Sequence, residues 1–200
     1  MDKKIIECVP NFSEGRDKEK IEKILDAFRG KKNVKLLDFS ADENHNRLVV
    51  TIAGEMEPIK NAVLDAMGIA TSIIDMREHK GEHPRMGATD VVPFIPVKNV
   101  SMTEVIEFSK IVAKEAAERY NIPIFLYEKS ASSPERENLA NIRKGQFEGM
   151  VEKLKQPEWK PDFGPDEIHP TAGVTAIGAR MPLVAFNVNL NTNNKEIAEH

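Results

Sequence analysis

Short apolar or β-branched runs alternate along the chain with longer segments in which apolar residues recur at helical spacing. The short runs predict β-strands at residues 4–9, 34–39, 47–53, 91–97, 122–127 and 183–190. The periodic segments predict helices at about 17–29, 58–79, from 101 onward, 133–145 and on to about 154. The stretches 10–15, 40–46 and 157–180 are polar or rich in glycine and proline, and they are expected to form loops.

The first six predicted elements follow the order strand, helix, strand, strand, helix, strand. Because this is the order of the split βαβ arrangement, the sequence predicts an α+β fold with a ferredoxin-like βαββαβ core. Further helices and strands are expected to extend this core, with a mixed sheet and helices on one face. Pro93 and Pro96 lack the amide hydrogen of a sheet ladder. The strand at 91–97 is therefore expected at an edge, or with its proline positions turned away from a neighbour.

Composition excludes several classes of partner. Apolar residues make up 40% of the 200 residues and charged residues 30%, which suits a folded core with an ordinary polar surface. The net charge of −4 gives the chain no electrostatic reason to bind nucleic acid or a membrane surface. No apolar run approaches the roughly 18 residues of a membrane span, and the N-terminus lacks a signal-peptide pattern. The single cysteine, Cys8, falls in a strand pattern and is expected in the core, and such cysteine usage favours the cytoplasm.

Segment 74–97 gathers histidines, arginines and carboxylates around Gly81, Pro84 and Gly87, which prevent a regular backbone. Charge on an irregular loop between rigid elements is typical of binding and catalytic sites. His83 follows the expected helix end, and an imidazole with an ordinary pKa of about 6.5 can accept and return a proton near neutrality. The alternative is an ordinary histidine on a surface loop.

Two arginines are candidates for bidentate binding of a carboxylate, namely Arg47 and Arg85. For each, the alternative is a solvated charge or an ion pair with Asp90 or Asp38. His79 and His83 have the spacing of zinc ligands on a helix, but the glycine and proline around them prevent a continuous helix, and we expect no bound metal. His79 is instead expected at the C-terminal end of the preceding helix, where the dipole favours a positive imidazole.

The long loop 161–180 is a second candidate site, because loops of this length are often functional. Gly164, Gly173 and Gly178 would let its backbone approach a flat or extended ligand. Gly173 and Gly178 have the spacing of a phosphate loop, but Ala179-Arg180 stands where such a loop needs Lys-Ser/Thr. A nucleotide site is therefore not expected.

Four segments together resemble the glutamate formimidoyltransferase (formiminotransferase) family. They are ECVPNFSEGR at 7–16, DMREHKGEHPRMGATDVVPFIPV at 75–97, EKLKQPEWKPDFGP at 152–165 and GARMPLVAFNVNL at 178–190. The resemblance implies the N-terminal lobe of a transferase domain at residues 1–192, with 193–200 beginning a linker or a second lobe. In the family, two such lobes face each other across a substrate tunnel.

The resemblance also implies an activity and a set of site residues. The family transfers a formimidoyl group between N-formimidoyl-L-glutamate and tetrahydrofolate in histidine degradation, with 5-formimidoyltetrahydrofolate as the folate product and without a metal. The family's catalytic histidine falls on His83, and substrate carboxylates are expected near Arg47, Arg85 and Arg180. The family's folate-contacting loop falls on Gly164, Pro165, Asp166, Glu167, Ile168, His169, Pro170, Thr171, Ala172 and Gly173.

Two alternatives remain beside a transferase lobe that works with folate and glutamate derivatives. The first alternative is a catalytically incomplete folate-binding or assembly module that needs a second lobe. The second is a metal-dependent hydrolase built on His79 and His83. If the second lobe is missing, the sheet face meant for it is expected to pair with another copy of the chain. We therefore also expect a homodimer or a larger assembly.

Overall fold

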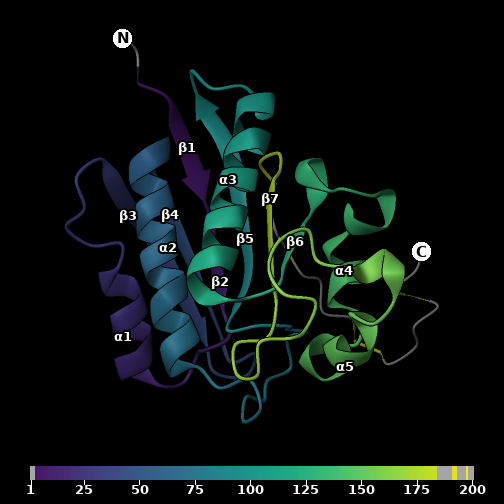
Figure 1. Ribbon diagram of the computed structural model, residues 1–200. Helices are drawn as coiled ribbons and strands as arrows, with labels where there is room; N and C mark the ends of the chain where they lie inside the picture. Colours follow the sequence, from purple (N-terminus) through teal and green to yellow (C-terminus); the bar gives the residue numbers. More distant parts are fainter. Residues whose placement is uncertain (1–2, 184–190, 193–196, 198–200) are drawn as a thin grey trace.

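The protein is described by a computed structural model that covers residues 3–183, 191–192 and 197. The described strands form one mixed sheet (Figure 1). They are β1 (Ile5–Cys8), β2 (Asn11–Phe12), β3 (Val34–Asp42), β4 (Arg47–Glu55), β5 (Thr89–Lys98), β6 (Ile124–Leu126) and β7 (Thr175–Ala179). The α-helices are α1 (Lys18–Asp26), α2 (Met56–Ile73), α3 (Met102–Tyr120), α4 (Leu139–Arg143) and α5 (Gln146–Lys153), and short 3₁₀ turns are η1 (Glu128–Ser130), η2 (Pro134–Arg136) and η3 (Pro157–Trp159).

The sheet joins an antiparallel half to a parallel half. β1 and β2 form one interrupted strand between β4 and β5, and β3 pairs with the far side of β4, all antiparallel. On the other side of β5, strands β7 and β6 follow in parallel. This arrangement confirms the predicted α+β class, because the antiparallel half has the strand order of a ferredoxin-like core and the parallel half extends it.

The two faces of the sheet are covered differently. Helices α1, α2 and α3 lie on one face (Figure 1) and share the main core with alternate residues of β4, such as Leu48, Val50 and Ile52. On the opposite face, α4 and α5 cover β5, β7 and β6 through a second core that includes Val91, Phe125 and Ala176, which lie one residue out of step with the first core. The rest of that face, over β3, β4 and β1/β2, carries half-buried and exposed side chains. We call it the open face.

The expected helix from residue 58 to near His79 is wrong at its C-terminal end. α2 ends at Ile73, and Ile74 already has an extended backbone. The Asp75 carboxylate accepts the Arg77 amide, and the Met76 amide donates to the Thr171 carbonyl from a distant part of the chain. Both bonds replace helical ones, so tertiary contact rather than helix propensity sets this boundary. His79 therefore lies in a loop beyond the helix.

Several other elements also differ from the prediction. β5 is an interior strand, so the edge alternative is wrong, although the β1–β5 register shifts beside Pro96. β2 and β7 formed where loops were expected, and the helix expected at 133–145 is divided into η2 and α4. The hydrophobic pattern did not predict β7, because this strand consists largely of small residues and is buried along its whole length. The strand expected at 183–190 and the linker or second lobe expected to begin at 193–200 fall largely outside the described residues.

The close packing of β7 against β6 leads to a stability prediction. A Cβ at Gly178 would lie 2.2 Å from the Tyr127 carbonyl oxygen, so Gly178→Ala must displace backbone. We expect it to lower the free energy of unfolding by about 2–4 kcal/mol in urea titrations. Gly149→Ala is the matched control, because no atom lies within 4 Å of its Cβ and the site is helical. That change should be neutral or stabilising by up to about 1 kcal/mol, and equal effects at the two sites would contradict this account of β7.

Candidate active site

A cavity of about 600 Å³ lies where the open face of the sheet meets α4. Its cationic lining residues are Arg47 at the start of β4, Arg143 at the end of α4 and Arg180 just after β7. Asn11 and Tyr127 add polar groups from β2 and from the residue after β6. We call this the arginine cavity. Because its three cations come from three distant parts of the sequence, only the fold brings them together.

Asp90 on β5 is a buried carboxylate that binds Arg143, one of the residues that line the cavity. One carboxylate oxygen accepts the Met86 amide at 2.9 Å, and the other accepts Nε of Arg143 at 2.9 Å and a second, very short bond from the same guanidinium. The Asp90 side chain is 3% exposed and that of Arg143 is 16% exposed. The pair therefore fixes Arg143 and the segment after His83 to the same strand.

Arg47 has no carboxylate partner among the contacts of the described residues. Its Nη1 lies 3.2 Å from Nε2 and 3.4 Å from Nδ1 of His83, and its Nε is buried without a hydrogen-bond acceptor in the described part of the chain. Burial and the neighbouring Arg143 lower the pKa of Arg47, although the guanidinium stays charged. An unsatisfied buried donor beside a cavity favours an anionic ligand.

His83 is held next to Arg47 by the docking of its loop on the turn before β4. The Glu82 amide donates to Asn44, and the Asn46 side chain donates to the Lys80 carbonyl. Burial, followed by the charges of Arg47, Arg143 and His45, lowers the pKa of His83 to about 3. The ring is therefore neutral at pH 7 and can accept a proton, but it is a weak base as long as these charges are uncompensated.

A second histidine stands beside His83. The His45 ring lies 6.1 Å from it, edge to face, and Nδ1 of His45 is 3.0 Å from the Asp42 carboxylate. Hydrogen bonding to His45 lowers the pKa of Asp42.

His79 and Arg85 are engaged elsewhere. The buried His79 ring makes a hydrogen bond to the Asn46 carbonyl through Nε2 and accepts Nε of Arg85 at Nδ1, and burial lowers its pKa. Its expected place at a helix end, as a positive imidazole, is therefore wrong. The Arg85 guanidinium also donates to the His79 carbonyl, to Gln146 and to both carboxylate oxygens of Glu148. Arg85 thus ties the His83 loop to α5, and it does not line the arginine cavity.

The hydrogen bonds between the loop 164–173 and the segment that carries His83 come from the C-terminal end of the loop. The carbonyls of Thr171 and Ala172 accept the amides of Met76 and Ala88, while the His169 ring accepts the Ala172 amide. Gly164–Pro165 and Asp166–Ile168 line two other hollows, of about 340 and 410 Å³. A Cβ at Gly164 or Gly173 would lie 2.5 or 2.2 Å from the protein's own backbone. These glycines are therefore required by packing, a different reason from the predicted approach of a ligand.

Of the predicted site residues, the structure places Arg47 and Arg180 in the arginine cavity and His83 in contact with Arg47, although His83 is not among the residues that line the cavity. It adds Arg143 and, through their ion pair, Asp90. Arg143 was missed because a single arginine near a helix end, two residues before a glycine, has no distinctive spacing in the sequence. Within the described ranges, no group of three or more metal-ligand side chains is found. Over those same residues, no helix combines the length and apolar character needed to cross a membrane.

Comparison with known proteins identifies the family of the chain. A family model described as "Formiminotransferase domain, N-terminal subdomain" matches residues 5–180. The chain belongs to this family. The predicted resemblance is therefore confirmed, and it extends over nearly all the described residues.

Several curated members of the family are similar over nearly the whole chain. "Glutamate formimidoyltransferase" of Streptococcus pyogenes serotype M1 is 55% identical over 195 residues, covering 98% of this chain and 65% of that protein. "Glutamate formimidoyltransferase" of Thermoplasma acidophilum is 44% identical over 197 residues, again covering 98% and 65%. "Formimidoyltransferase-cyclodeaminase" of Rattus norvegicus is 48% identical over 186 residues, covering 93% and 34%. The chain thus spans just under two thirds of the length of the first two relatives.

The contact between Arg47 and His83 leads to a prediction for this family member. Replacing Arg47 by Met removes the largest charge acting on His83, so the His83 pKa should rise from about 3 by about one unit. NMR titration of the histidine ring signals measures this pKa. Arg77→Met is the control, because Arg77 is an exposed arginine paired with Asp75, and it should leave His83 unchanged. A His83 pKa near 6.5 in the unmodified chain would contradict the described environment of the ring.

Proposed function

We propose that this chain carries the acid–base half of a formimidoyl transfer from N-formimidoyl-L-glutamate to tetrahydrofolate. The observation that carries the proposal is the meeting of a neutral imidazole, His83, with a guanidinium, Arg47, that lacks a carboxylate partner among the described residues. The names of the two relatives that match 98% of the chain support the same reaction class.

Substrate recognition is assigned to the arginine cavity. The donor carries the two carboxylates of glutamate, and folate carries a glutamyl tail, so each substrate offers anions to guanidinium groups. Arg143 is already paired with Asp90, whereas Arg47 has unsatisfied donor capacity. Within the described part of the chain, the Arg180 side chain donates only to the neighbouring Met181 carbonyl. Arg47 and Arg180 therefore bind the carboxylate directly in this proposal, and Arg143 adds positive potential.

His83 would move the proton that the reaction requires. A ring nitrogen of tetrahydrofolate attacks the formimidoyl carbon, and His83 accepts the proton that this nitrogen loses. The tetrahedral intermediate then breaks its bond to the glutamate nitrogen, and His83 returns the proton to that leaving nitrogen. The products are 5-formimidoyltetrahydrofolate and glutamate, and His83 ends in its starting state. Such acid–base catalysis contributes roughly 10²- to 10⁴-fold.

Substrate binding would also adjust the base. In the free chain, burial and, after it, the neighbouring cations hold the His83 pKa at about 3, which is too low for efficient proton acceptance near pH 7. A carboxylate bound to Arg47 offsets that positive charge and raises the His83 pKa toward the ordinary value of about 6.5. The histidine thus becomes a competent base when the substrate is present.

The alternative function is a folate-binding or assembly module that needs a second lobe for catalysis. It is favoured by the open face beside the cavity and by the 65% coverage of the related transferases. The predicted folate loop 164–173 and the predicted homodimer remain proposals under either reading. A single-turnover assay with and without a separately supplied second lobe separates the two functions, because activity that appears only on mixing favours the module.

Replacement of His83 tests the acid–base role. In whichever of those assays shows transfer, His83→Gln should lower the turnover by about 10²- to 10⁴-fold, since Gln keeps a polar group beside Arg47 but cannot shuttle a proton. His45→Gln is the matched control, because the two rings lie 6.1 Å apart, and it should retain most of the activity. Near-normal turnover by His83→Gln would overturn the proposed role.

Binding of L-glutamate tests the arginine cavity without catalysis. L-glutamate provides both carboxylates of the donor, and its dissociation constant can be measured from the His83 ring signals. Arg47→Met should weaken binding by about 10- to 100-fold, the size expected when a charged hydrogen bond is lost. Arg85→Met should have little direct effect on this constant, because its guanidinium is occupied by Glu148. A stronger loss at Arg85 than at Arg47 would relocate the carboxylate site.

A further inference from the structure

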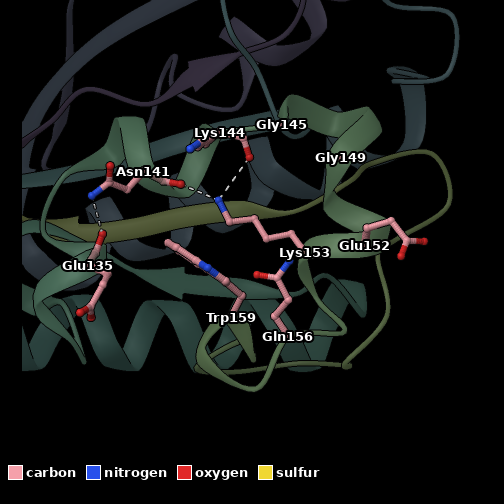
Figure 2. A pocket seen from close by; sticks show the side chains of 9 residues that line it. All are labelled: Glu135, Asn141, Lys144, Gly145, Gly149, Glu152, Lys153, Gln156 and Trp159. Carbon is pink, nitrogen blue, oxygen red and sulfur yellow. Dashed lines mark hydrogen bonds between the residues drawn. The ribbon is translucent and has the colours of Figure 1, made fainter.

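Lys153 is a buried lysine whose side chain extends away from solvent. It is the last residue of α5, and its side chain reaches back across a hollow of about 490 Å³ to the end of α4 (Figure 2). Only 8% of the residue is exposed. A buried lysine needs acceptors for its ammonium group, because an unpaired buried charge is strongly unfavourable.

The ammonium group finds these acceptors at the end of α4. Nζ donates to the carbonyls of Asn141, Ile142 and Lys144, the last two at 2.7 and 3.3 Å. α4 has one turn, so its last carbonyls have no partner within the helix. Lys153 thus supplies all three of its donors to cap this short helix, and the positive charge also suits the negative end of the helix.

An aromatic ring completes the environment of the lysine. Nζ lies 3.9 Å from the centre of the Trp159 ring, a cation–π contact. The Trp159 ring in turn contacts Phe125 of β6 edge to face, with 6.2 Å between the ring centres. The lysine is therefore fixed between the end of α4 and a ring that is anchored on the sheet.

Arg143 lies between two of the carbonyls that Lys153 binds. Its backbone is flanked by Ile142 and Lys144, and its guanidinium pairs with the buried Asp90 and lines the arginine cavity. A one-turn helix has little stability of its own, so the backbone on both sides of Arg143 depends on the cap. We propose that Lys153 is a positioning residue that holds Arg143 in the arginine cavity.

The proposal has a test that needs no ligand. In Lys153→Met, the proton on Nε of Arg143 should exchange with solvent about tenfold faster by NMR, because its bond to Asp90 opens more often. Lys110→Met is the control, since Lys110 is exposed and paired with Glu107, and it should change nothing. If Lys153→Met does not fold, Trp159→Leu carries the test and should give a smaller increase. Unchanged exchange in the folded variants overturns the proposal.

A double-mutant cycle then separates positioning from general stabilisation. Lys153→Met should weaken L-glutamate binding by about tenfold, and in an Arg143→Met background the same change should have no further effect on binding. Its effect on the free energy of unfolding should persist in both backgrounds. Equal loss of binding in both backgrounds would make Lys153 merely structural.

The ligand arm of this experiment rests on the proposed function, whereas the exchange arm does not. If L-glutamate does not bind the unmodified chain, the carboxylate site fails while the exchange result still decides the role of Lys153. If Arg47→Met and Arg143→Met weaken binding but Lys153→Met does not, the carboxylate site stands and the positioning role fails.

Discussion

The rest of the site depends on the hydrogen bonds and the ion pair that the buried Asp90 carboxylate forms. It accepts an amide from the segment that carries His83 and two bonds from Arg143 on α4, so a loop and a helix are both fixed to β5. Removing one partner of a buried ion pair lowers the free energy of unfolding by more than the pair contributes to it, because the other charge stays buried without a partner. Asp90 therefore sets the geometry of the cavity, because both its loop and its helix are held through this one carboxylate.

A second consequence concerns the arginines that Asp90 does not pair. Asp90 binds Arg143, and the two carboxylates that line the cavity, Glu128 and Glu137, form no ion pair with Arg47 or Arg180 among the described residues. Burial and then the adjacent cations lower the pKa of His83. In the proposed function, a carboxylate bound to Arg47 would offset part of that positive charge and so couple substrate affinity to the strength of the base. Lys153 belongs to this system because it holds the short helix from which Arg143 projects.

Sequence patterns were most successful where periodicity and local chemistry agree. The split βαβ order was readable because β1, β3, β4 and β5 are bounded by clear turns and helices. The helix expected from residue 101 onward is α3, which begins at a Ser101–Glu104 capping box. Patterns failed where a distant contact replaced a local one. α2 stops early because the Met76 amide donates to the Thr171 carbonyl. β7 is a strand because β5 and β6 pair with its two sides.

The same division applies to the site. The sequence by itself determined the α+β class, the family and the candidates His83, Arg47 and Arg180, because periodicity and long motifs are properties of contiguous residues. Only the tertiary structure decided which charges meet. In the folded chain, Arg85 pairs with Glu148 and Arg143 pairs with Asp90. His79 and Lys153 are buried, and each binds backbone carbonyls. The physical reason is that ion pairing and desolvation depend on distances between side chains remote in sequence, which no local pattern encodes.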